Sequence, residues 1–179
     1  MKKFELTTDT KMRFGKKLFR IKALISFGNV KVGDMGGYIE KEENLSQSGN
    51  AWVSGNARVF GNALVSGNAL ASGNAEVSGN ARVFGNAWVS GNAEVLGNAL
   101  VSGDADYATA SGFGSEYRTT TFFKLKNSDE IGVRCGCFYG TLKEFKEIVK
   151  ETHGETKKAK EYLMLADLME YRFSEEKKA

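Results

Sequence analysis

The sequence predicts a mainly β protein built around a parallel β-helix, and three observations predict it. Glycine stands at every sixth position from Gly49 to Gly103, followed by Asn (by Asp104 in the last copy) and then by Ala. Val lies two residues after most of these alanines, so the repeating unit is N-A-x-V-x-G. Residues 44–116 carry only two Lys+Arg and five Asp+Glu, between two highly charged ends. A short, uninterrupted period of this kind is typical of a solenoid of stacked coils.

Each six-residue unit has the pattern of one short strand and one corner. Ala and Val, two positions apart, point to the same side of an extended chain and form the interior, whereas the x positions point outward. Gly-Asn falls between the strands, where the chain turns, because Gly accepts a positive φ and Asn tolerates it. A helix is excluded because glycine at every sixth position would cost about 1 kcal/mol per copy in a helix interior.

The unit V-S-G-N-A-x resembles the hexapeptide repeat of left-handed β-helix proteins, in which an aliphatic residue and a small residue two before it point inward. The resemblance implies a left-handed coil of three hexads, or about 18 residues, per turn. We expect about four coils over residues 39–115, with the repeat strongest over 44–105. In this chain Ser or Phe, and in one copy Leu96, stands between the aliphatic residue and the glycine, which departs from the pattern of that family.

Residues 1–38 are expected to form an N-terminal cap made of strands. The stretch 17–24, KLFRIKAL, alternates apolar and basic residues as a strand does. The glycine-rich stretch 30–40 lacks the spacing of a phosphate-binding loop, and we interpret it as the turn into the first coil.

Residues 116–179 are expected to form a C-terminal cap of one β-hairpin, over 119–138, and two α-helices. A capping box that begins at Thr141 starts the first helix, which ends at His153. The second helix covers about 157–173. Its expected apolar face consists of Tyr162, Leu163, Ala166, Met169 and Phe173.

Residues one coil apart stack into columns, which divides the outer surface into three faces. The first face carries Trp52, Leu70 and Trp88, here called the tryptophan column. A soluble monomer rarely leaves such an apolar strip bare, and Trp is enriched in interface hot spots. We expect a contact between subunits, with a trimer favoured because proteins that resemble this fold are commonly trimers packed side to side. Two alternatives stay open: the C-terminal segment covers the column, or the column is a platform for a sugar or a base.

The other two faces differ in character. The second face stacks Arg58 on Glu76 and Glu94, and we interpret it as solvated surface rather than as an acid–base pair of carboxylates. The third face is the second candidate for a binding surface. It carries Leu64, Arg82 and Leu100.

The sequence predicts no catalytic residue, no metal site and no cofactor. Many left-handed β-helix proteins are acyltransferases with a histidine as general base, and others resemble a carbonic anhydrase that binds zinc through three histidines. This chain has one histidine, His153, outside the repeat, and we interpret it as a favourable partner of a helix dipole. Cys135 and Cys137 make a weak zinc motif, and we interpret them as buried small apolar residues.

Charge and targeting signals restrict the partners. The net charge of +3 is too small to indicate nucleic acid or a membrane, and we expect neither as a partner. The basic, aromatic-interleaved stretch 11–22 has the composition of a nucleic-acid contact, but we interpret its basic residues as the solvent side of an edge strand. The N-terminus lacks the apolar run of a signal peptide, and no segment approaches the ~20 apolar residues of a membrane span. With two cysteines and no disulfide framework, we expect a cytoplasmic protein.

Both flanks resemble those of uncharacterised hexapeptide-repeat proteins of bacteriophages and prophages. The resemblance lies in GKKLFRIKAL and VGDMGGYIEKEENLS ahead of the repeat and in CGCFYGTLKEFKEIVKETHGETKKAKEY behind it. It implies a phage or prophage origin and no established activity. We expect a non-catalytic, oligomeric binding protein that inhibits a host defence system by binding a host protein or sequestering a signalling molecule. The alternatives are an acyltransferase-like enzyme with a degenerate site and a virion structural protein.

Overall fold

The computed structural model describes residues 1–114 and 116–174. Its contacts divide the chain into two compact units, Met1–Asp104 and Ala105–Ala179. This division differs from the expected boundaries at residues 39 and 116. The N-terminal strands belong with the solenoid because they pair with it. The segment after Asp104 belongs with the C-terminal elements because β13 (Tyr107–Ala110) pairs with β14 (Thr120–Lys124) instead of starting another coil.

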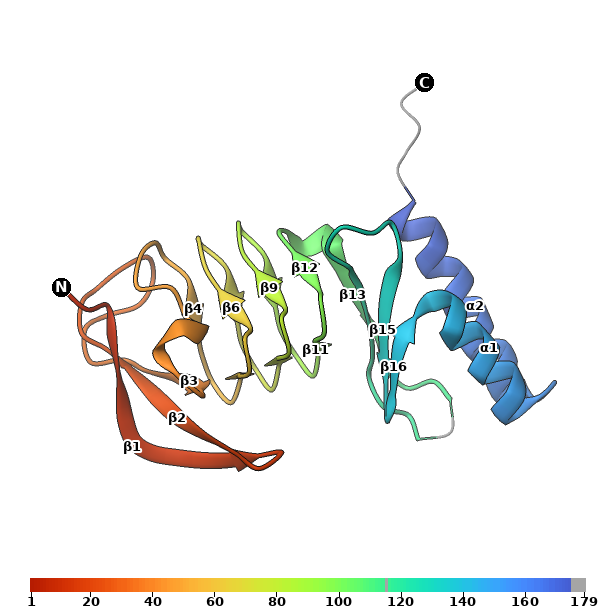
Figure 1. Ribbon diagram of the computed structural model, residues 1–179, viewed down its shortest axis with the longest axis horizontal. Coiled ribbons are helices and arrows are strands. Elements are labelled where there is room, and N and C mark those ends of the chain that lie inside the picture. The colour runs from red at the N-terminus through yellow and green to blue at the C-terminus, as the bar shows by residue number, and fades with distance from the viewer. Residues whose placement is uncertain (115, 175–179) are drawn as a thin grey trace, which may run out of the picture. The chain divides into compact units, whose positions relative to one another are not determined.

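Residues 52–101 form a solenoid of two-residue strands separated by corners (Figure 1). Trp52 lies opposite Leu70, and Leu70 lies opposite Trp88, so each coil holds 18 residues. Within this segment the strands make three parallel ladders, which confirms the predicted β-solenoid of about four coils. The strands are β4 (Trp52–Val53), β5 (Arg58–Val59), β6 (Leu64–Val65), β7 (Leu70–Ala71), β8 (Glu76–Val77), β9 (Arg82–Val83), β10 (Trp88–Val89), β11 (Glu94–Val95) and β12 (Leu100–Val101).

The interior and the corners of the solenoid follow the repeat. The Ala and Val positions of the repeat, from Ala51 to Val101, are all fully buried, as predicted. At the corners, asparagine side chains form ladders along the stack. Asn50 Nδ2 donates to Asn68 Oδ1 at 3.2 Å, and Asn68 donates in the same way to Asn86 at 3.1 Å. These ladder bonds therefore stabilise the contact between one coil and the next.

The N-terminal strands extend one face of the solenoid. The strands β1 (Phe4–Arg13) and β2 (Lys16–Ala23) form an antiparallel hairpin, and β2 pairs with β3 (Met35–Ile39). In turn β3 pairs in parallel with β5, and the short helix η1 (Glu42–Asn44) follows it. The glycine-rich stretch leads into the first coil as expected. Its glycines allow close packing, since a Cβ at Gly37 would lie 2.6 Å from the carbonyl oxygen of Ala57.

The second unit is a sheet packed against helices. Over its described residues the antiparallel order is β13-β14-β15-β16, in which β15 covers Ile131–Cys135 and β16 covers Phe138–Thr141. The predicted hairpin is confirmed as β14–β15, inside this larger sheet. The helices α1 (Leu142–His153) and α2 (Lys157–Phe173) begin and end close to the predicted residues, and Thr141 caps α1. Their shared core includes Phe122, Val133, Phe145, Val149 and Ala166.

Candidate functional site

The structure places the six predicted binding residues in two separate columns. Trp52, Leu70 and Trp88 stack on the face made by β4, β7 and β10. Leu64, Arg82 and Leu100 stack on the face made by β6, β9 and β12. Both columns follow from the 18-residue coil. Whether either column binds another molecule depends on what covers it.

The N-terminal member of the tryptophan column, Trp52, is covered by another part of the chain. Trp52 is only 5% exposed, because the ring of Phe27 packs edge-on against its indole with ring centroids 5.4 Å apart. Phe27 lies in the loop between β2 and β3, where its backbone bridges to Val30. Over Trp52 the cover therefore comes from the N-terminal segment of the same chain, and not from the C-terminal segment that the sequence left open as an alternative. An isolated aromatic residue in a loop gave no sequence signal of this contact.

Trp88 is the exposed member of the column. Its side chain is 53% exposed, and its indole Nε1 donates to Ser72 Oγ at 2.7 Å. Its backbone N–H donates to Asp104 Oδ1 at 2.8 Å. Ser72 follows the strand that carries the half-buried Leu70, one coil earlier. The indole is thus held in one orientation over the neighbouring strand while much of its surface faces solvent.

The second face is not the solvated surface that the sequence indicated. Glu76 is buried, and its Oε2 lies 2.7 Å from Arg13 Nε and 3.4 Å from Arg58 Nε. Phe60 is also buried, in a cluster with Leu18 and Tyr38. Since Arg13 and Leu18 come from the hairpin β1–β2, this hairpin covers part of the face. The outward direction of a position in the repeat therefore does not establish its exposure.

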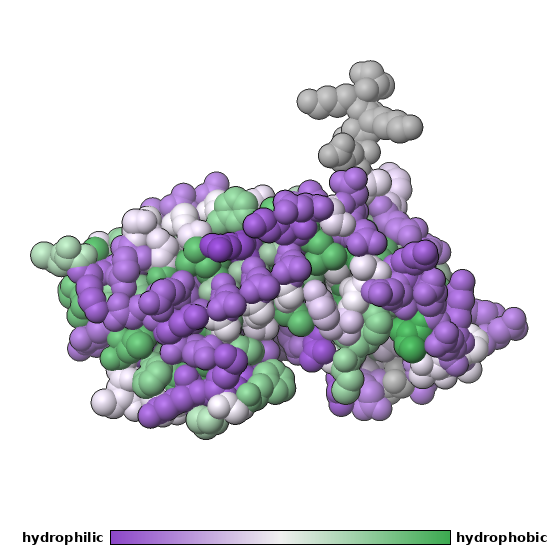
Figure 2. All heavy atoms as spheres, in the orientation of Figure 1, coloured by the Kyte–Doolittle hydropathy of each residue, from purple (hydrophilic) through white to green (hydrophobic). Residues whose placement is uncertain are grey.

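The third face is polar around its leucines. Arg82 is exposed, whereas Leu64 and Leu100 are half-buried. A cavity of about 320 Å³ lies beside Leu64 and Arg82, and its other walls are mainly polar or charged. Figure 2 shows polar residues predominating on the side turned to the viewer, with apolar residues in small separate groups. Among the six predicted residues, Trp88 therefore offers the largest exposed apolar side chain.

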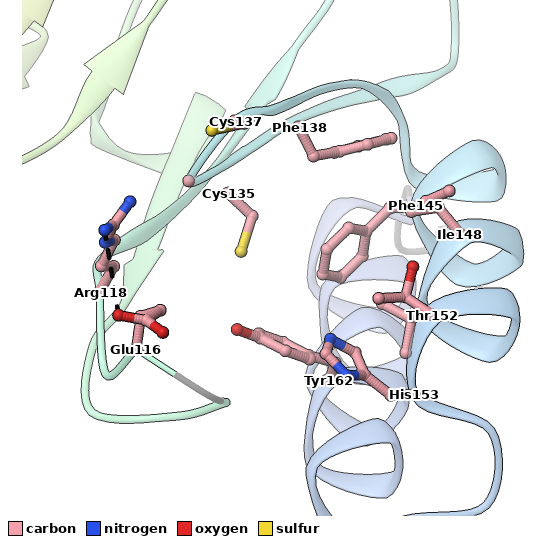
Figure 3. A pocket seen from close by; sticks show the side chains of 12 residues that line it. Glu116, Arg118, Cys135, Cys137, Phe138, Phe145, Ile148, Thr152, His153 and Tyr162 are labelled. Atoms are coloured by element: carbon pink, nitrogen blue, oxygen red, sulfur yellow. Dashed lines mark ion pairs between the residues drawn. The ribbon is translucent and has the colours of Figure 1, made fainter.

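The second unit contains a separate cavity of about 280 Å³ between β15, β16 and the two helices. Phe138, Phe145 and Ile148 form much of its apolar wall. Figure 3 shows the Cys135 sulfur and the Tyr162 hydroxyl pointing into it from opposite sides. Arg118 and Glu116 also line it, with Arg118 Nη2 4.0 Å from Glu116 Oε2. The cavity has room for a small apolar group.

The reactive side chains around this cavity are engaged with other groups. Cys135 Sγ accepts a hydrogen bond from the Thr120 hydroxyl at 3.2 Å, and the His153 ring stacks on Tyr162 with centroids 6.0 Å apart. His153 lies at the end of α1, as predicted. The interpretation of the two cysteines as buried is wrong for Cys137, which is exposed at the β15–β16 turn, and Cys135 is only half-buried. In the described part of the chain, no three His, Cys, Asp or Glu side chains lie close enough together to hold a metal ion.

Three stretches of the solenoid match a known repeat family; they are residues 51–67, 57–73 and 75–91. The family is the YdcK beta solenoid repeat. The match covers the coils that bear Trp52, Leu70 and Trp88 and leaves both flanks outside. No curated protein matches the chain. Among residues 1–114 and 116–174, no helix has the length and apolar character that a bilayer crossing requires.

Proposed function

We propose that the protein is a non-catalytic binding protein that associates with copies of itself through the face centred on Trp88. The observation that carries this proposal is an indole that is 53% exposed and yet held by the hydrogen bond to Ser72. A large aromatic side chain that is already ordered loses little conformational entropy on binding, so more of its burial contributes to affinity. The half-buried Leu70 beside it enlarges the apolar area.

The parallel ladders fix the backbone of this surface, and a surface that is already ordered loses little entropy on association. We propose a trimer, as in proteins that resemble this fold, with one such face from each subunit. The proposed setting is the cytoplasm of a bacterial host, and the proposed task is interference with a host defence system. Setting and task rest on the resemblance of the flanking sequences to phage and prophage proteins.

The first experiment is light scattering of the full chain and of two variants. We expect Trp88→Ala to lower the solution mass of the wild-type oligomer to that of a smaller species. Glu5→Ala, an exposed change on β1 outside both columns, is the control and should leave the mass unchanged. Self-association through this face would be contradicted if Trp88→Ala kept the mass of the wild type. It would also be contradicted if the wild type were monomeric at 100 µM with Trp88 still exposed.

The enzyme alternative has its own measurement. An acyltransferase-like protein would bind acetyl-coenzyme A between subunits and would gain thermal stability from it. We expect no shift of the melting temperature at millimolar acetyl-coenzyme A. A clear upward shift, lost in Trp88→Ala, would instead favour the enzyme.

A further inference from the structure

The helix α2 is apolar on two opposite sides. Ala159, Tyr162, Ala166 and Met169 face the core of the second unit and are buried. On the other side, Met164, Leu168 and Tyr171 are 71%, 54% and 81% exposed. This second apolar stripe (Met164, Leu168 and Tyr171) follows the spacing i, i+4, i+7 of a single helix face.

A stripe of this kind needs a partner. Single exposed apolar residues are common, but three large ones in line on one helix form a continuous apolar surface. The groove that such a stripe fits best is made by another helix, because side chains three and four apart interdigitate with those of a facing helix. The question is which helix supplies it.

The charges beside the stripe point to a second copy of α2. At about 100° per residue, Lys160 and Asp167, seven apart, lie on one flank of the stripe. Glu161 and Arg172, eleven apart, lie on the other flank. On each flank, therefore, one cation and one anion lie on either side of residue 165 along the helix. Two copies that run antiparallel bring the cation of one copy toward the anion of the other on both flanks.

One register of two antiparallel α2 helices allows both charge pairs to form. With a two-fold axis near residue 165, Lys160 faces Asp167 of the other copy and Arg172 faces its Glu161. In each pair the two residues differ in position along the helix axis by about 4.5 Å, because the helix rises about 1.5 Å per residue. Within their own chain, Asp167 accepts from Lys146 at 2.8 Å, and Glu161 accepts from the Gly114 N–H at 3.4 Å. Asp167 remains 71% exposed in that contact, so a second cation can approach it. A two-fold contact of one surface with itself also has the symmetry most common among homo-oligomers.

We propose that α2 pairs antiparallel with α2 of a second copy, through the second apolar stripe and the two charge pairs beside it. This interface is separate from the face around Trp88. It forms whether or not that face associates, so the two can be tested independently in one set of variants.

The experiment measures the solution mass of Trp88→Ala and of further variants made in that background. We expect Trp88→Ala to remain dimeric at 50 µM, and Trp88→Ala/Leu168→Glu to be monomeric, with dimer affinity reduced at least 100-fold. Lys143→Glu, an exposed change on α1, is the matched control and should leave the dimer intact. A monomeric Trp88→Ala, or an undiminished mass after Leu168→Glu, overturns the proposal.

A charge exchange tests the direction of pairing. Arg172→Glu sets two carboxylates opposite each other and should weaken the dimer at least fivefold, whereas Glu161→Arg/Arg172→Glu should restore it. In a parallel pair these residues lie about 16 Å apart along the axis, and the exchange would have no such effect. Failure of the double variant to recover affinity overturns the antiparallel arrangement. Retained helical circular dichroism in every variant shows that the changes act on association.

Discussion

Trp52 and Trp88 occupy the same position of the repeat, two coils apart, and their surroundings differ completely. Trp52 packs under Phe27, whereas Trp88 faces solvent and bonds to Ser72. Replacing Trp52 by Ala should therefore lower the free energy of unfolding by about 3–5 kcal/mol, as for other buried aromatic residues. Urea unfolding checks this. The same change at Trp88 should cost well under half as much, and equal losses at both sites would contradict the structure.

Glu76 is a buried carboxylate between two guanidinium groups. Glu76→Gln removes the negative charge and leaves Arg13 and Arg58 close together without it, so we expect a loss of about 2 kcal/mol in the free energy of unfolding. Denaturant titration at neutral pH measures this loss. Glu5→Gln, an exposed change on β1, serves as the control. A loss no larger than that of the control would mean that the hairpin does not hold this face.

Lys3 makes the free energy of unfolding depend on pH in the alkaline range. Its Nζ is buried and donates to the Ala51 carbonyl at 2.8 Å, and burial lowers the pKa of Lys3 from 10.5 to about 8. Between these two values the unfolded chain binds more protons at this site than the folded chain does. The contribution of Lys3 to the free energy of unfolding therefore rises with pH from about 8 to 10.5.

The variant Lys3→Met isolates this contribution, because all other titrating groups are common to both proteins. The difference in unfolding free energy, wild type minus Lys3→Met, should increase between pH 7.5 and pH 10. Urea titrations of both proteins at the two pH values measure it. A constant or falling difference would show that Lys3 keeps its ordinary pKa in the folded protein.

At the scale of the element, the corners allow a closely matched comparison. Gly73 and Gly91 share one corner column, with φ of +67° and +66°. A Cβ at Gly73 would lie 3.1 Å from the Gly91 nitrogen, whereas one at Gly91 would meet nothing within 4 Å. Gly91→Ala should therefore cost only the strain of the left-handed conformation, about 1 kcal/mol. Gly73→Ala should cost at least twice as much in chemical unfolding, and equal costs would rule out tight stacking at this corner.

The elements themselves were largely predictable from the sequence. The six-residue period identifies the inside and outside of every strand, because a strand has a side-chain period of two and the corner glycines set its length. The capping box at Thr141 and the apolar spacing of the second helix likewise predict α1 and α2. The β13 strand was missed because Tyr107–Ala110 directly follows the repeat and resembles another degenerate copy of it.

At the scale of the whole molecule, the sequence could not show what covers each face. Glu76 and Trp52 are buried by residues 63 and 25 positions earlier in the chain, Arg13 and Phe27. Those contacts depend on where the hairpin and the β2–β3 loop lie, and no local pattern encodes that placement. The second apolar stripe on α2 could have been found, since Met164, Leu168 and Tyr171 already show helical spacing in the sequence. The sequence-based prediction for this helix named only the opposite face, that of Tyr162, Ala166 and Met169, because packing against one core needs only one apolar face.

The 18-residue coil has a consequence for insertions and deletions. Removing one hexad, residues 79–84, keeps every Ala and Val inward but moves Trp88 to the position now held by Arg82, on the third face. Inserting a whole coil of 18 residues into the natural chain keeps every later residue on its own face and only lengthens the stack. An insertion or deletion of six residues therefore leaves the pattern of the core unchanged but moves every later outward-facing residue to the neighbouring face. Such a chain can exchange its binding surfaces without redesigning its interior.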